Sequence, residues 1–206
     1  MIGIIDYGMG NLGSVSNACR FLGLPFSILA RPEEMKACRA VILPGVGAFG
    51  DCMDHLVRNG YVEAVREWIG ASRPFLGICL GLQVLYEGSE ESPGVPGLGV
   101  LPGRVRRFNL PPEWKVPQIG WNRVRQVRRD CPLFAEVPDG AYFYFVHSYY
   151  AEKTNTAVDA GATEYGLEYT SAVWRDNVLA VQFHPEKSQK NGLQMLRNFG
   201  RWADRR

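Results

Sequence analysis

Short apolar runs alternate with amphipathic segments along the first half of this 206-residue chain. Apolar runs that are too short for helices predict buried strands at residues 2–5, 26–30, 40–43 and 74–78. Apolar residues at helical spacing predict helices between or after these strands, at residues 11–22, 51–59, 62–70 and 80–87. Because strands that alternate with helices form parallel sheets, this half predicts a mostly parallel, doubly wound α/β sheet flanked by helices.

From residue 99 onward the pattern changes to strand-like runs. These runs lie at residues 100–108, 116–127, 142–146, 163–169 and 172–183. Asp176-Asn177 predicts a hairpin turn inside the last run, so we expect an antiparallel-rich C-terminal half. A final helix is predicted over residues 189–203. The length is ordinary for one large α/β core, and we expect residues 1–206 to form a single domain.

The composition argues against several classes of function. The formal net charge is only +2 and 21% of the residues are charged, which gives no electrostatic reason to expect nucleic-acid binding. No apolar stretch reaches the ~18 residues of a membrane span, and the chain begins without a signal-peptide pattern. The cysteines are odd in number and lack disulfide or zinc-ligand spacing. We therefore expect a reducing, cytoplasmic compartment, with no membrane partner, metal or cofactor.

The segment Gly77-Ile-Cys79-Leu-Gly81 directly follows an apolar run and has the pattern of a nucleophile on a strand-to-helix turn. A nucleophile on a sharp turn needs small neighbours, and glycine stands two residues before and two residues after Cys79. The helix-forming residues that follow would place the sulfur at a helix N-terminus, where the dipole favours thiolate. A buried structural cysteine is the alternative. The paired glycines favour a catalytic Cys79.

A catalytic thiolate needs a base, and the chain contains three histidines. His184 ends an apolar strand, and Glu186 follows two residues later, on the same side if the chain stays extended. The intervening proline favours that extension, and a carboxylate beside an imidazole orients it and stabilises the imidazolium. We therefore predict a triad of Cys79, His184 and Glu186. His147 ends another strand without an adjacent carboxylate and stays an alternative base, whereas His55 is expected on the solvent side of a helix.

Residues 8–13 match the G-x-G-x-x-G pattern of a dinucleotide-binding loop, directly after the first predicted strand. Such a loop needs an acidic residue about twenty positions later to bind the ribose. Here the second strand ends at residues 30–31 without that acid. The pattern therefore favours a structural or docking turn over a cofactor site.

An acyl-transfer site also needs donors for the oxygen that becomes negative during the reaction. Residues 43–47 follow the third predicted strand, and the glycines among them expose the backbone N–H groups of Val46 and Gly47. The N–H group of Leu80 is a further donor, because the residue after the nucleophile on such a turn faces the same oxygen. A flexible connection between strand and helix is the alternative interpretation of residues 43–47.

Three motifs together resemble the class I, triad-type glutamine amidotransferases. They are Gly77-Ile-Cys79-Leu-Gly-Leu-Gln83, Phe183-His184-Pro-Glu186-Lys-Ser and Pro44-Gly-Val-Gly47. Further segments resemble the glutaminase subunits of imidazole glycerol phosphate synthase, and this resemblance covers essentially the whole chain. These segments are Asp6-Tyr-Gly-Met-Gly-Asn11-Leu, Pro44-Gly-Val-Gly-Ala-Phe-Gly50, Gly120-Trp121-Asn122 and Tyr144-Phe-Val-His-Ser148-Tyr149.

The resemblance implies a reaction on L-glutamine. Cys79 attacks the side-chain amide and forms a γ-glutamyl thioester, ammonia leaves, and water then releases glutamate. His184 moves the protons, and Glu186 orients His184. The resemblance also implies substrate contacts from Gly47, Gln83, Glu91, Ser148 and Tyr149.

The resemblance further implies a partner subunit. Ammonia passes to a cyclase, a (β/α)8 barrel that forms a heterodimer with this chain in histidine biosynthesis. The cyclase makes imidazole glycerol phosphate and aminoimidazole carboxamide ribotide. Asn11, Trp121 and Lys187 match positions that the family places at or near this interface. Gln118-Ile119 departs from the histidine and methionine that are usual there, on the interface side.

Three other functions remain open from the residues. A cysteine hydrolase or peptidase of the same fold would keep Cys79 and His184 but act on other acyl groups. A glutaminase that serves another synthase would keep the chemistry and change only the partner. A non-catalytic binding module with a nucleotide-type loop predicts that Cys79→Ser has no effect.

Overall fold

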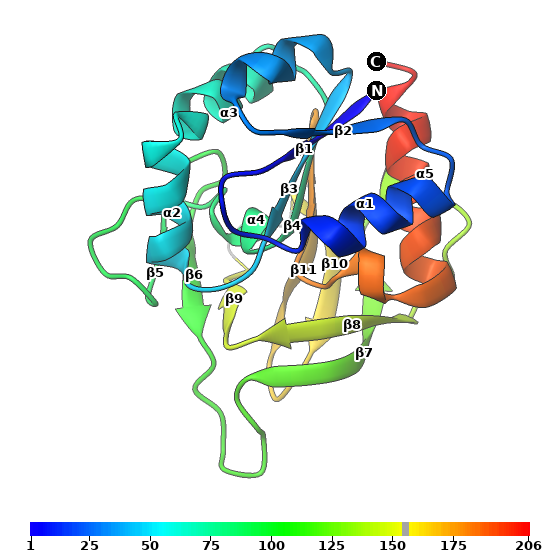
Figure 1. Cartoon of the computed structure of the whole chain (residues 1–206). Coiled ribbons are helices and arrows are strands. Elements are labelled where there is room, and N and C mark those ends of the chain that lie inside the picture. Colours follow the sequence, from blue (N-terminus) through cyan, green and yellow to red (C-terminus); the bar gives the residue numbers. More distant parts are fainter. Residues whose placement is uncertain (154–156) are drawn as a thin grey trace.

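The computed structural model describes residues 1–153 and 157–206, and a mixed sheet runs through both halves of the chain (Figure 1). The strand order is β2-β1-β3-β4-β12-β11-β10-β7-β8, and β9 connects β11 to the short strands β6 and β5. The strands of the main order that pair in parallel are β1 (Ile2–Ile5), β2 (Phe26–Leu29), β3 (Ala40–Gly45), β4 (Phe75–Cys79) and β12 (Val178–Val181), and outside it β5 and β6 also pair in parallel. The other strands are β5 (Gly88–Ser89), β6 (Arg104–Arg107), β7 (Gln118–Gln126), β8 (Ala141–His147), β9 (Tyr149–Ala151), β10 (Asp159–Glu164) and β11 (Glu168–Arg175).

Helices cover both faces of the parallel part of the sheet (Figure 1). On one face lie α2 (Phe49–Arg58) and α3 (Tyr61–Gly70), and on the other lie α1 (Leu12–Phe21) and α5 (Gln189–Ala203). The short helices are α4 (Leu80–Gln83), η1 (Pro32–Ala37), η2 (Pro132–Phe134) and η3 (Pro185–Lys187). This architecture confirms the predicted fold class. None of the helices in the described ranges is long and apolar enough to cross a membrane.

The central strands are apolar at successive positions because each face of the sheet meets a different layer of helices. Ile2 and Ile4 of β1 belong to the core that contains α1 and α5, whereas Ile5 belongs to the core that contains α2 and α3. Leu76 and Phe75 of β4 are divided between the two cores in the same way. A strand buried on both faces has no polar side, which explains the continuous apolar runs in the sequence. Each such side chain contributes roughly 1.5–3 kcal/mol through burial.

The predicted helix over residues 80–87 is wrong in length, because α4 ends at Gln83. Beyond it, the carbonyl oxygens of Val84 and Leu85 accept hydrogen bonds from a segment further along the chain. The donors are the N–H groups of Leu98 and Leu101, at 2.7 and 2.9 Å. These carbonyl groups are therefore engaged outside the helix, and the chain turns away after one helical turn.

The predicted strand over residues 163–169 is also wrong. Two strands share this stretch, because β10 ends and β11 begins inside it and the two pair antiparallel. The turn between them is closed by a 2.9 Å hydrogen bond from the N–H group of Tyr165 to the carbonyl oxygen of Leu167. The aromatic and β-branched residues on both sides of the turn made the stretch resemble one strand.

The remaining predictions for the second half are close to the structure. The run at residues 100–108 is a strand only over β6, because the backbone bends at residues 100–103 before it. The hairpin turn at Asp176-Asn177 is confirmed, since Arg175 of β11 pairs with Val178 of β12 across it. The final helix, α5, has the predicted bounds.

Candidate active site

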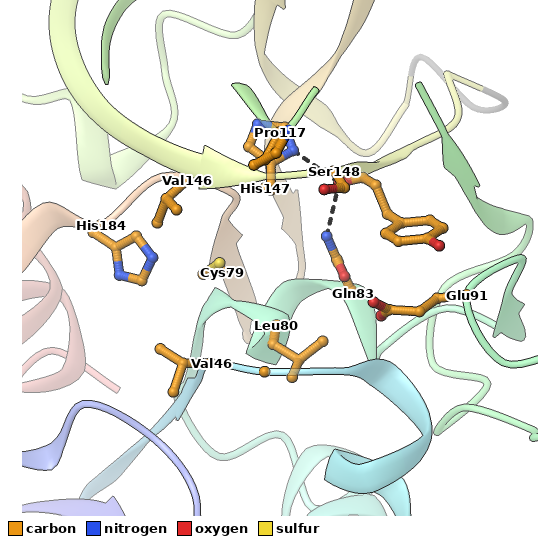
Figure 2. Close-up of a pocket in the computed structure, with 12 residues that line it drawn as sticks. Val46, Cys79, Leu80, Gln83, Glu91, Pro117, Val146, His147, Ser148 and His184 are labelled. Atoms are coloured by element: carbon orange, nitrogen blue, oxygen red, sulfur yellow. Dashed lines mark hydrogen bonds between the residues drawn. The ribbon is translucent and has the colours of Figure 1, made fainter. Parts of the chain in front are cut away.

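The turn at Cys79 joins β4 to α4 at the carboxyl edge of the parallel strands. Cys79 has φ 55° and ψ −107°. A non-glycine residue in so sparsely populated a conformation costs about 1–3 kcal/mol. The side chain lines a cavity (Figure 2). The geometry confirms the strand-to-helix turn that the sequence predicts.

Gly77 and Gly81 allow the backbone to pack closely on either side of Cys79. A Cβ atom on Gly77 would lie 2.5 Å from the carbonyl oxygen of Gly81. A Cβ atom on Gly81 would collide with the carbonyl oxygen of Leu43 on the neighbouring strand β3. Both obstacles are backbone atoms, which cannot move aside as a flexible side chain can. The two glycines therefore serve close approach, while the strained φ falls on Cys79 itself.

The four residues of α4 change one expectation about the sulfur. The sequence predicts a longer helix whose dipole would stabilise the thiolate, but the structure has a single turn. A macrodipole is the sum of many aligned peptide dipoles, and one turn provides few of them. Other groups around Cys79 must therefore supply most of that stabilisation.

His184 reaches the cavity from β12, which lies parallel to β4 with Val181 opposite Ile78. Its imidazole points toward the same space as the Cys79 sulfur (Figure 2). Its Nδ1 lies 2.8 Å from Oε1 of Glu186, and both side chains are 1% exposed. The other ring nitrogen, Nε2, is buried and has no hydrogen-bond partner within the described parts of the chain. Glu186 thus orients the ring and leaves Nε2 available.

The groups around His184 favour its protonated form. Burial lowers the pKa of His184, but the neighbouring Cys79 sulfur and the Glu186 carboxylate outweigh burial and raise that pKa to about 10. An imidazolium beside a thiolate is the reactive form of cysteine–histidine pairs. The arrangement can therefore support attack by sulfur at neutral pH.

His147, the alternative base, is held in other contacts. Its Nδ1 lies 2.8 Å from the carbonyl oxygen of Tyr149, and its Nε2 lies 3.2 Å from the hydroxyl group of Tyr169. A carbonyl oxygen only accepts, so Nδ1 carries the hydrogen. Burial lowers the pKa of His147 to about 4, which keeps the ring neutral. The geometry therefore favours His184 as the base.

The cavity between these groups has a volume of about 410 Å³. The predicted site residues that line it are Val46, Gly47, Cys79, Leu80, Gln83, Glu91, Ser148, Tyr149 and His184. Glu186 lies behind the imidazole and does not line the cavity. Pro117 and Val146 line it as well, and no sequence pattern points to them.

Two side-chain amides meet beside the cavity, that of Gln83 in its lining and that of Gln182 buried next to Gln83. Gln83 donates from Nε2 to the carbonyl oxygen of Tyr149 at 2.9 Å and to Oε1 of Gln182 at 3.0 Å. Figure 2 draws as dashed lines the hydrogen bonds of Gln83 and His147 to the carbonyl oxygen of Tyr149. Gln182 in turn places its Nε2 3.7 Å from the Cys79 sulfur. Sequence reasoning missed Gln182, although a polar residue inside the apolar run before His184 is a signal that identifies it.

Val46 and Gly47 line the opposite side, just beyond the end of β3. Val46 is 37% exposed, and Gly47 has φ +97°. The N–H group of Leu80 is among the first in α4, and such groups have no acceptor within the helix. Glu91, a predicted substrate residue, lines the cavity but also accepts from the N–H group of Phe49 at 2.7 Å. Glu91 thereby holds the start of α2, which follows residues 46–47.

The predicted interface residues lie on neighbouring elements. Trp121 is 47% exposed, and its ring centroid lies 6.1 Å from that of Tyr144. The ammonium group of Lys187 lies 5.9 Å from the same tyrosine ring. Asn11 caps α1 by accepting from the N–H group of Ser14 at 3.4 Å, and α1 packs beside η3, which contains Lys187. The structure thus brings Trp121 and Lys187 together around Tyr144, with Asn11 on an adjoining helix.

Two further polar residues differ from the predictions. The sequence suggests Gln118 and Ile119 together on the interface side, but only Ile119 is exposed, at 63%, and Gln118 is buried. Gln118 accepts from the Tyr169 hydroxyl group at 2.9 Å. His55 is half-buried instead of solvent-facing, because its Nδ1 lies 3.0 Å from the carbonyl oxygen of Tyr7.

A family model described as glutamine amidotransferase class-I matches residues 4–202. The chain belongs to this class-I glutamine amidotransferase family. Of the residues that the motifs predict for catalysis, Cys79 and His184 line the cavity described above, and Glu186 lies behind His184.

Among the relatives of this amidotransferase are proteins named imidazole glycerol phosphate synthase subunit HisH. The one from Desulfitobacterium hafniense (strain DSM 10664 / DCB-2) is 50% identical over 204 residues, covering 99% of this chain and 95% of the relative. The one from Moorella thermoacetica is 52% identical over 199 residues, covering 97% and 93%. The one from Thermococcus kodakarensis is 50% identical over 208 residues, covering 98% and 100%. The chain is therefore an enzyme. It is a glutamine amidotransferase of the type that forms one subunit of this synthase in histidine biosynthesis.

Solved structures agree with the fold. A crystal structure described as a glutamine amidotransferase aligns with a TM-score of 0.77 at 20% identity, covering 98% of both chains. The structure of PurLQS from Thermotoga maritima aligns with a TM-score of 0.78 at 17% identity, covering 98% of this chain and 97% of that one. At these identities the likeness concerns the fold alone.

Proposed function

We propose that this amidotransferase hydrolyses L-glutamine through a thioester on Cys79. The sulfur attacks the side-chain amide carbon, and His184 gives a proton to the departing nitrogen, so that ammonia leaves. His184 then takes a proton from water as its oxygen attacks the thioester. The carbon–sulfur bond breaks, the electron pair returns to sulfur, and glutamate is released. Glu186 keeps the imidazole oriented through both steps.

The observation that supports this proposal most directly is the shared cavity of Cys79 and His184. Both side chains line the same space, and Glu186 lies 2.8 Å from the far nitrogen of the imidazole. Nucleophile, base and orienting carboxylate are therefore arranged in the order that acyl transfer requires. One sheet connects the strands that provide them, so we also propose that residues 1–206 act as one amidotransferase domain.

The proposal assigns the remaining cavity residues to the substrate. The oxygen that becomes negative in each tetrahedral intermediate is bound by N–H groups at the ends of two neighbouring strands, β3 and β4. These donors belong to Val46, Gly47 and Leu80. The polar groups of glutamine outside the reacting amide contact Gly47, Gln83, Glu91, Ser148 and Tyr149. The Glu91 carboxylate and the backbone carbonyl groups nearby suit the ammonium group of the substrate.

We propose a cyclase subunit as the partner that receives the ammonia. The support is that the relatives are named as subunits of imidazole glycerol phosphate synthase. Free ammonia is mostly protonated near neutral pH and cannot attack an acceptor, so it must travel through a path closed to water. The exposed face formed by Ile119, Trp121 and Lys187 is the docking surface in this proposal, with Asn11 beside it. The cyclase uses the ammonia to make imidazole glycerol phosphate and aminoimidazole carboxamide ribotide.

The isolated chain is expected to be a poor glutaminase. Residues 46–47 follow the end of β3 and are exposed, so the N–H groups there are not held by a strand ladder. We infer that docking of the cyclase with its nucleotide bound directs these groups toward the substrate oxygen. Only then is the negative intermediate stabilised fully.

Glutamate release tests the proposed function. The chain is assayed alone, with purified cyclase, and with cyclase and its nucleotide substrate, and Cys79→Ala is assayed in parallel under each condition. We expect glutamate to appear mainly in the complete mixture, together with imidazole glycerol phosphate, and not with Cys79→Ala. Equal turnover of wild type and Cys79→Ala would contradict the thioester. Equal rates with and without cyclase would contradict the activation by docking.

A further inference from the structure

Gln182 is a buried amide that the reaction described above does not use. It lies between the apolar residues Val181 and Phe183, and none of its surface is exposed. Burying an amide without hydrogen bonds is unfavourable, because the amide gives up its bonds to water. The contacts of its side chain therefore indicate why an amide occupies this position. Those contacts are with Gln83 and with the Cys79 sulfur.

The orientation of the Gln182 amide follows from a chain of hydrogen bonds that starts away from the sulfur. The carbonyl oxygen of Tyr149 can only accept, so Gln83 must face it with its nitrogen, at 2.9 Å. That same nitrogen lies 3.0 Å from the Gln182 side chain and needs an acceptor there, which is Oε1. With Oε1 fixed toward Gln83, Nε2 of Gln182 faces the Cys79 sulfur, at 3.7 Å.

The backbone oxygen at the start of this chain is itself held from the other side. Nδ1 of His147 lies 2.8 Å from the carbonyl oxygen of Tyr149. Because the His147 ring is buried and neutral, it has one N–H group to donate, and it donates it here. The direction in which Gln182 points its N–H groups is therefore set by Gln83, whose own amide is oriented by the Tyr149 carbonyl oxygen, independently of the state of the sulfur.

We propose that Gln182 is a hydrogen-bond donor to the Cys79 sulfur and stabilises its anionic form in the resting enzyme and in the second half of the reaction. The proposal rests on the thioester chemistry described above. A donor held at a fixed distance favours negative charge on its acceptor, and the single turn of α4 offers little help of that kind. When water displaces the sulfur from the thioester, the sulfur takes the bonding electron pair, and the same N–H group donates a hydrogen bond to the sulfur that now carries the negative charge.

Alkylation of Cys79 by iodoacetamide tests this role without glutamine or cyclase. The rate is measured across pH by mass spectrometry of the peptide that contains Cys79, so that the other four cysteines do not contribute. In Gln182→Met and Gln182→Glu the donor is lost with little change in size. We expect the midpoint of the alkylation profile to move at least one pH unit toward alkaline, together with a tenfold or larger loss of glutamate release in the complex.

Asn177→Asp is the matched control, because Asn177 is also a buried amide at the other end of β12. Its side chain donates to the carbonyl oxygens of Ile69 and Arg73. It lies beside the end of β12 that pairs with Phe75, whereas Cys79 lies at the opposite end of β4. This variant loses stability, but its alkylation midpoint is expected to stay that of wild type. A general loosening of the sheet would shift both profiles, and that outcome would overturn the proposal.

A second variant keeps the test decisive if the Gln182 variants do not fold. Gln83→Glu removes the donor that fixes Oε1 of Gln182, so the Gln182 amide can rotate, and an alkaline shift smaller than that of Gln182→Met is expected. Wild-type midpoints in every folded variant at Gln182 and Gln83 would overturn the proposal. Absence of glutamate release from the wild-type complex would instead contradict the proposed function, and the alkylation profile would still report on Gln182.

Discussion

Two segments that follow the carboxyl ends of neighbouring strands differ in how deeply they are buried. Gly45 at the end of β3 lies opposite Cys79 at the end of β4 in the sheet. After β4 the chain is buried, with Gln83 only 4% exposed, and its backbone packs against β3 with no room for a Cβ atom on Gly81. After β3 the chain emerges into solvent, with Val46 37% exposed.

This difference in burial corresponds to two separate functions of the site, which are to hold the attacking atom and to bind the developing charge. The attacking atom must be held in one place, because a small displacement from the productive geometry is costly in rate. The groups that bind developing charge are needed only when a substrate and a partner are present. In our proposal the fixed segment after β4 provides the first, and the exposed residues 46–47 provide the second.

The largest effect is expected from removing the base on the fixed side. His184→Ala should lower glutamate release by the complex more than about 1000-fold, because neither the thiolate nor the leaving nitrogen then has a proton partner. Steady-state glutamate formation at saturating cyclase measures this loss. A decrease of less than tenfold would assign the base to another group.

Gly81→Ala should disrupt the fixed segment itself. The added methyl group would collide with the carbonyl oxygen of Leu43, so we expect a loss of more than about 3 kcal/mol in the free energy of unfolding, or failure to fold. Urea denaturation followed by circular dichroism measures it. Gly70→Ala is the control, since nothing lies within 4 Å of a Cβ atom there, and its stability should match or exceed that of wild type.

The neutral His147 should make the stability of the fold sensitive to acid. Burial lowers its pKa to about 4 in the folded chain, whereas an unfolded histidine titrates near 6.5. The unfolded chain therefore binds the extra proton, and stability that is present above pH ~6.5 is lost as the pH falls through that value toward 4, by up to about 3 kcal/mol. Urea denaturation at several pH values measures the slope. The slope should be flatter in His147→Gln, and identical slopes would show that folding does not lower the pKa of this ring.

The smallest effect is expected on the exposed side. Gly47 has φ +97°, and an alanine there is strained by about 1 kcal/mol in a segment that can adjust. Gly47→Ala should leave the unfolding free energy within about 1 kcal/mol of wild type but reduce cyclase-stimulated glutamate release about tenfold. Parallel measurement of stability and stimulated activity separates the two effects. A loss of stability as large as that of Gly81→Ala would mean that the segments do not differ.

Local patterns in the sequence were sufficient for the elements that form the site. The glycines around Cys79 and the closely spaced His184 and Glu186 are short-range signals, and the structure brings these residues together. The buried strands were equally visible, because burial on both faces leaves uninterrupted apolar runs. The failure at residues 80–87 has a long-range cause. The helix after Cys79 ends early because Val84 and Leu85 bond to a loop much later in the chain, which no local pattern reveals.

Contacts of side chains with residues distant along the chain could not be predicted from the sequence either. Gln118 and His55 carry no mark of burial, and each is turned inward by one hydrogen bond to a residue distant along the chain. Gln182 could have been noticed as a polar residue in an apolar strand, but its contact with the sulfur depends on the register between β12 and β4. The roles proposed for the substrate and interface residues remain predictions.

The pairing of β12 with β4 has a consequence for the order of events at the ribosome. Cys79 is translated long before His184. The last strand to be synthesised, β12, is the one that must pair with β4. A nascent or truncated chain that ends before β12 therefore has the thiol of Cys79 but not the imidazole of His184. Under the proposed chemistry, such a chain does not hydrolyse glutamine.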